Sequence, residues 1–253
     1  MFSEHEKKKS KIISQLWKDI SGANGWICPP HELSHVFFAI PACHGELGSS
    51  EHSFEKTKKP LEDFINKNNL EDSLFVKKNI HQNNKYAPNN LELVVKSNSY
   101  DELLEFSSDF KEEYQKSFRN AISETILNAH PQQVVDMMGF DVFKYRRENN
   151  LSLEENSNDF VFSLMAKEEG REDLGQILGE YIEIKQSFNS FHEVINHLIK
   201  ESKKNEGLDY IYNRLKLKNP ALNSHIETLE EPKSIISEQN KNPLDGSGKH
   251  QIS

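Results

Sequence analysis

Cysteine is scarce in this sequence, which has two among 253 residues. Two thiols cannot build a disulfide framework, so the composition indicates a protein of a reducing, intracellular compartment. No apolar run approaches the length of about eighteen residues that a membrane-spanning helix requires, and we expect no membrane span. The chain also lacks positive net charge, because 31 Lys and Arg face 40 Asp and Glu, for a formal charge of −9. Since counterion release needs a basic surface, we expect no nucleic-acid partner.

Three common motifs are absent as well. The sequence contains no G-x-x-x-x-G-K-[ST], no G-x-G-x-x-G and no G-x-S-x-G. These patterns build phosphate-cradling loops and the serine-hydrolase nucleophile turn, so neither a nucleotide-binding enzyme nor a serine hydrolase is expected.

Hydrophobic residues make up 35% of the chain and include fifteen Phe, which is enough for a core. Their spacing of three and four positions is typical of amphipathic helices, most clearly in a long run from Tyr100 to His130. Ser3 is placed to cap a first helix, and Leu91 to Val95 is the best strand candidate. The sequence predicts a mainly α protein, a single irregular helical domain over residues 1–217 with at most a small β element.

The composition changes near Pro220. From there the chain holds few large apolar groups and many Pro, Gly, Ser, Asn and Glu residues, which bury too little surface to offset the entropy of ordering. We therefore predict a flexible, acidic C-terminal tail over residues 218–253.

One short motif carries chemistry. His31, Glu32 and His35 form H-E-x-x-H within a predicted helix over residues 30–40. On a helix, His residues four positions apart lie on one face and can share a zinc ion, while the intervening Glu reaches the metal-bound water. Zinc lowers the pKa of that water, and the carboxylate takes its proton as it attacks a carbonyl.

The motif resembles that of the zincin-type metallopeptidases. The resemblance implies zinc as cofactor, a protein or peptide substrate, His31 and His35 as metal ligands and Glu32 as the catalytic base. A catalytic site needs a third protein ligand. His44 is our prediction for it, with Glu46 and Glu51 as alternatives.

A structural zinc site is the rival interpretation of the same segment. Cys28 and Cys43 bracket the motif, so a closed tetrahedral site can be drawn from both thiolates, His44 and one of the two motif histidines. Glu32 separates the hypotheses, because only catalysis requires it. A third hypothesis makes Cys43 a nucleophile with a neighbouring His as base.

The acidic residues near the C-terminus, Glu227, Glu230, Glu231 and Glu238, resemble the translocation signals of type IVB-secreted bacterial effectors. This resemblance implies a bacterial cytoplasmic protein that is translocated into the cytosol of a host cell, where it acts on a host protein.

The alternative function is non-enzymatic. In this hypothesis the chain is a helical effector or interaction protein, with or without a structural zinc, that binds a partner through an exposed apolar groove.

Overall fold

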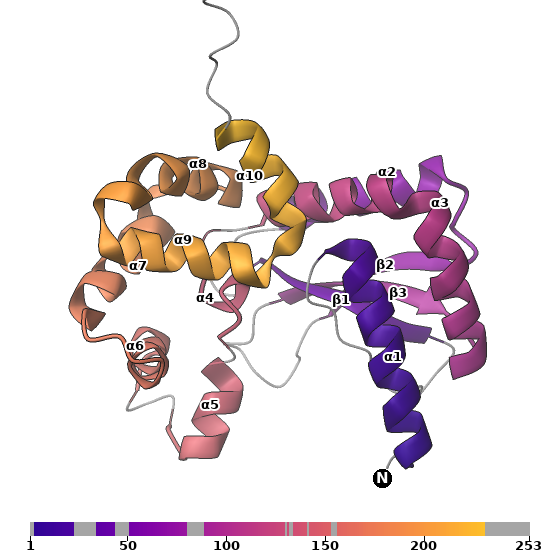
Figure 1. Ribbon diagram of the computed structural model, residues 1–253, viewed down its shortest axis with the longest axis horizontal. Helices are drawn as coiled ribbons and strands as arrows, with labels where there is room; N and C mark the ends of the chain where they lie inside the picture. Colours follow the sequence, from indigo (N-terminus) through magenta and orange to yellow (C-terminus); the bar gives the residue numbers. More distant parts are fainter. Residues whose placement is uncertain are drawn as a thin grey trace, which may run out of the picture.

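Helices make up most of what the computed structural model describes, and the mainly α class is confirmed (Figure 1). The described residues are 3–22, 34–43, 51–79, 89–129, 131, 134–140, 142–152 and 156–230. The helices are α1 (Glu4–Ser21), α2 (Glu51–Lys67), α3 (Tyr100–Leu127), α4 (Val134–Met137), α5 (Val142–Asn149), α6 (Asn158–Glu168), α7 (Leu174–Ser187), α8 (Phe191–Glu201), α9 (Glu206–Lys218) and α10 (Asn223–Glu230). Two short 3-10 helices are η2 (Ser202–Lys204) and η3 (Pro220–Leu222). None of these described helices combines the length and hydropathy needed to cross a membrane.

The β element is one antiparallel sheet of three strands, β1 (Ser34–Cys43), β2 (Leu74–Asn79) and β3 (Asn89–Lys96), in the order β1-β3-β2. The predicted strand over Leu91 to Val95 is confirmed as the centre of β3. Side chains on both faces of β3 are buried, since Leu93 is fully covered and the neighbouring Val94 is 1% exposed. A strand covered on both faces is rich in apolar residues, and the run from Leu91 to Val95 is apolar except for the buried Glu92, which made the strand visible in the sequence.

The helix predicted over residues 30–40 is wrong, because residues 34–43 form β1. Ser34 pairs with Lys96 and Ile40 with Leu91 of β3. The segment is rich in β-branched and aromatic residues, which favour a strand, and a short apolar run does not distinguish a strand from a helix by periodicity. Pro41 is tolerated because β1 is an edge strand of the sheet.

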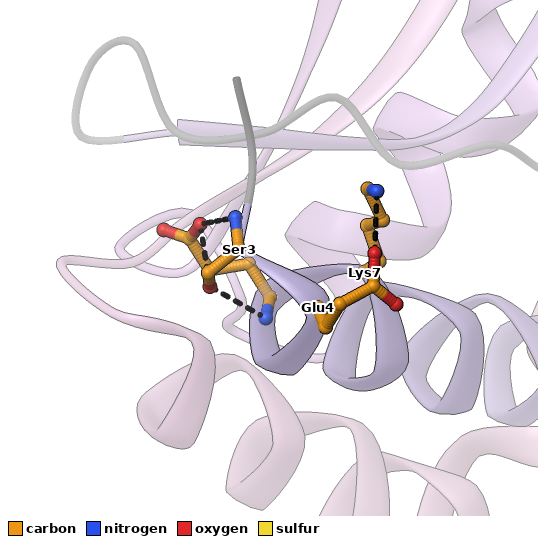
Figure 2. Close-up of polar contacts among 4 residues, drawn as sticks. Ser3, Glu4 and Lys7 are labelled. Atoms are coloured by element: carbon orange, nitrogen blue, oxygen red, sulfur yellow. Dashed lines mark hydrogen bonds and ion pairs between the residues drawn. The ribbon is translucent and has the colours of Figure 1, made fainter.

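The first helix begins where the sequence predicts. The Ser3 hydroxyl accepts a hydrogen bond from the Glu6 N–H at 3.2 Å, and the Glu6 carboxylate accepts one from the Ser3 N–H at 2.7 Å. Figure 2 shows this reciprocal capping box and the Glu4–Lys7 ion pair one position further on, at 2.7 Å. The two hydrogen bonds of the capping box satisfy the N–H groups of Ser3 and Glu6, which have no partner within the helix.

Aromatic side chains join α1, α2 and α3. The Trp17 ring of α1 lies 5.2 Å from the Phe110 ring and 5.6 Å from the Phe118 ring of α3, and Phe64 of α2 lies 5.4 Å from Phe118. On its other side α2 contacts the sheet. In Figure 1 this group occupies the right of the molecule, and α5 to α9 gather on the left.

The end of the described chain belongs to the folded core, which corrects the boundary of the predicted tail. Leu222 of η3 and Ile226 of α10 are fully buried, and the Asn219 side-chain amide donates to the Met137 carbonyl at 2.7 Å. The domain therefore extends past residue 217 to at least α10. Residues 231–253, the rest of the predicted tail, lie outside the described residues.

Candidate functional site

The predicted zinc site falls mostly on residues that the structure does not describe. Outside the described residues lie Cys28, His31, Glu32, His44 and Glu46. His35 lies in β1 opposite Val95, Cys43 ends β1, and Glu51 begins α2. Within the described part of the chain, no three His, Cys, Asp or Glu side chains are grouped so that they could hold a metal ion.

The helix that the predicted zinc site requires does not include His35, because His35 lies in β1. The other two motif residues, His31 and Glu32, lie outside the described part of the chain. The zinc site with His31, Glu32 and His44 stays a prediction.

A groove of about 390 Å³ lies where the C-terminal end of α1 meets α3. We call it the α1–α3 groove. It is lined by Lys18, Asp19, Gly22, Lys111, Gln115, Arg119 and Pro220. The three residues from α3 are spaced four positions apart, so they form one stripe along that helix.

The end of α1 shapes one wall of the groove. Gly22 adopts the left-handed conformation with φ of 64°, and its N–H donates to the Lys18 carbonyl at 2.8 Å. A Cβ on Gly22 would lie 3.4 Å from the backbone nitrogen of Ala221, so η3 packs closely against the turn. Glycine is suited to this position because a left-handed conformation is costly for residues with a Cβ.

Arg119 fastens α3 to this helix end. Its Nε donates to the Ile20 carbonyl at 2.8 Å, and a terminal nitrogen donates to the Asp19 carbonyl. These carbonyls belong to the last turn of α1, which has no partners for them within the helix. The guanidinium is therefore held in one orientation at the edge of the groove.

The groove is positively charged although the chain is acidic. Lys18, Lys111 and Arg119 carry three positive charges against the single negative charge of Asp19. Asp19 accepts a hydrogen bond from Gln15 at 2.9 Å. Neither lysine forms an ion pair with another described residue. Lys18 also opposes the partial negative charge at the end of α1, but Lys111 lies in the middle of α3 and has no such role.

The chemistry of the lining favours binding over catalysis. It presents two ammonium groups, a guanidinium, an amide and one carboxylate, and none of the lining residues is a His, Cys, Ser or Tyr. Ammonium and guanidinium groups are donors that recognise carboxylates and phosphates. The arrangement can hold an anionic group.

Sequence analysis missed this site. The spacing of Lys111, Gln115 and Arg119 is visible within the predicted long helix, but nothing in the sequence indicates that the end of α1 faces that stripe. Comparison of the chain with protein-family models, with curated proteins and with solved structures finds no match. The candidate site therefore rests on the residues of this chain alone.

Proposed function

We propose that the chain is a non-enzymatic interaction protein that binds an acidic segment of a partner protein in the α1–α3 groove. The observation that carries the proposal is the concentration of Lys18, Lys111 and Arg119 around one groove of a chain whose net charge is −9. Charge complementarity of this kind selects partners and speeds their association. The interaction hypothesis from the sequence expected an apolar groove, and this groove is basic instead.

The acidic residues near the C-terminus suggest where the partner is found. If the chain is translocated into a host cell, as the resemblance to type IVB effectors implies, the acidic segment belongs to a host protein. Binding in the groove does not depend on that translocation, and the two can be tested separately.

The zinc peptidase stays the competing hypothesis. It is supported by the H-E-x-x-H pattern of His31, Glu32 and His35. It is weakened because residues 34–40, expected in the ligating helix, form β1.

A charge-reversal experiment tests the proposal. The probe is a fluorescein-labelled peptide of alternating Glu and Ser, titrated with the full chain and followed by fluorescence anisotropy. We expect the double substitution Lys18→Glu and Lys111→Glu to weaken binding about tenfold or more, because two attractions in the groove become repulsions.

The matched control changes the same charge on the same two helices outside the groove. Lys11→Glu with Lys116→Glu replaces exposed lysines of α1 and α3 that do not line the groove. We expect this variant to bind within about twofold of the parent, as is usual for screened surface charges. Equal losses in both variants, or no binding by the parent chain, would reject the proposal.

A further inference from the structure

The charge balance of the groove points to a ligand with more than one negative charge. Three cationic side chains and one carboxylate line it, which leaves an excess of two positive charges. A phosphate monoester carries a charge of about −1.5 to −2 at neutral pH, whereas a Glu or Asp side chain carries one negative charge. A single phosphate therefore matches the groove better than a single carboxylate does.

Arg119 is prepared to bind such a group. Its Nε and one terminal nitrogen are engaged by the carbonyls of α1, and the other terminal nitrogen has no hydrogen-bond partner among the described residues. The free edge of a guanidinium binds two phosphate oxygens side by side. Because the carbonyls already fix the plane of the side chain, less conformational entropy is lost when a ligand binds.

The two lysines complete the recognition. Lys18 extends from α1 and Lys111 from α3, so the cations approach the groove from different helices. Each carries an ammonium group that is not committed to a carboxylate of the described chain. Ammonium groups act as point charges on phosphate oxygens, and together with Arg119 they provide donors from several directions.

We infer that the α1–α3 groove takes a phosphorylated serine or threonine side chain of a protein partner. The inference rests on the proposed function, since it specifies which acidic segment the groove prefers. The net negative charge of the chain disfavours binding of other macromolecules that carry phosphate. With a chain charge of −9, an extended contact with a nucleic acid or an anionic membrane meets repulsion outside this groove, whereas a single phosphorylated side chain needs only a local contact.

The test compares three labelled peptides that differ at one position in a neutral Gly and Ser background: phosphoserine, glutamate and serine. We expect the phosphoserine peptide to bind about tenfold more tightly than the glutamate peptide, because it adds charge and a third acceptor oxygen. Lys18→Glu with Lys111→Glu should abolish that preference, and Lys11→Glu with Lys116→Glu should retain it.

The dependence on pH is a second readout. The second ionisation of a phosphate has a pKa of about 6, so binding of the phosphoserine peptide should fall between about pH 7 and pH 5. A glutamate side chain, with a pKa of about 4.3, stays ionised over most of this range. Comparison of the two probes removes any pH effect that arises from the protein.

The outcomes separate this inference from the proposed function. Equal affinity for the phosphoserine and glutamate peptides would overturn the preference for phosphate, and binding of the Glu-Ser probe would still support the acidic partner. Failure of every peptide would reject both. A last probe is a phosphatidylcholine vesicle that contains a phosphatidylinositol phosphate. If the chain binds this vesicle more tightly than the phosphoserine peptide, and Lys18→Glu with Lys111→Glu abolishes that binding, the proposal of a protein partner is overturned.

Discussion

The Trp17 indole N–H donates a hydrogen bond to the hydroxyl of Ser107, and this buried contact ties α1 to α3. The Ser107 hydroxyl donates in turn to the Leu103 carbonyl at 2.7 Å, so it acts both as an acceptor and as a donor. Trp17 is 2% exposed and Ser107 is fully buried. This polar contact lies within the aromatic core where α1 packs on α3, the two helices that form the groove.

Ser107→Ala should destabilise the fold by about 1–3 kcal/mol, because the buried indole N–H loses its acceptor. The measurement is the free energy of unfolding from urea denaturation, followed by Trp fluorescence. Ser108→Ala, at the neighbouring exposed position of α3, is the control and should change stability by less than about 0.5 kcal/mol. The same loss in both variants would show that the hydrogen bond contributes nothing specific.

Two glycine substitutions should act in opposite directions. Gly22→Ala forces a residue with a Cβ into a left-handed conformation beside Ala221, and should cost about 1–2 kcal/mol. Gly179 lies in the interior of α7, and apart from its own helix backbone nothing lies within 4 Å of the Cβ that alanine would add, so Gly179→Ala should stabilise by about 0.5–1 kcal/mol. Thermal unfolding of the two variants beside the parent checks both signs. Stabilisation by Gly22→Ala would contradict the conformation of the turn.

The stability of the fold should fall as His225 takes up a proton. Burial of the imidazole lowers its pKa, the nearby His192 lowers it further, and Glu124 acts in the opposite direction. The two His rings, from α10 and α8, lie 5.4 Å apart, and the buried His225 Nε2 has no hydrogen-bond partner among the described residues. The unfolded chain, in which a His has a pKa of about 6.5, binds the proton more readily than the folded chain. Stability is therefore kept above that pH and lost below it.

Urea midpoints at about pH 7.5 and about pH 5.5 measure this effect, because a His changes its charge between these values. The decrease between the two conditions should be smaller in His225→Gln than in the parent chain. His5→Gln, at an exposed position of α1, should leave the decrease unchanged. A decrease that is the same in all three proteins would assign the pH dependence to other groups.

Removal of metal should leave peptide binding intact. Under the proposed function, dialysis against a chelator should not change the binding of the acidic peptide, because the α1–α3 groove binds it through Lys18, Lys111 and Arg119. Elemental analysis of the purified chain and a peptidase assay on Glu32→Gln complete the measurement. Two results together would favour the zinc peptidase instead. The chain would hold one bound zinc that is lost in His35→Ala, and it would hydrolyse peptides in a reaction that Glu32→Gln abolishes.

The long helices were predictable because each carries its signal locally. Ser3 and Glu6 mark the start of α1, and the apolar spacing of α3 follows its buried face over 28 residues. The sheet was only partly predictable. β3 buries mostly apolar side chains on both faces, so its run is visible locally. β1 forms through pairing with β3, from Cys43 with Asn89, 46 positions on, to Ser34 with Lys96, 62 positions on, and no local pattern indicates that partner.

The same reasoning explains the missed groove and the misplaced tail boundary. Leu222 and Ile226 stand alone among polar residues, so the local composition indicates a tail, yet both are buried against other helices. Lys18 and Lys111 are unremarkable in the sequence, since isolated lysines on helices are usually solvated. Their significance arises only when α1 and α3 pack together.

Arg119 also links the occupancy of the groove to the order of a helix end. Its guanidinium holds carbonyls of the last turn of α1 and also lines the groove, so under the proposed function an anion that immobilises this side chain should also protect the final turn of α1 from fraying. Slower deuterium uptake by the amides near Ser21 and Gly22 would then report the bound state without any label on the partner.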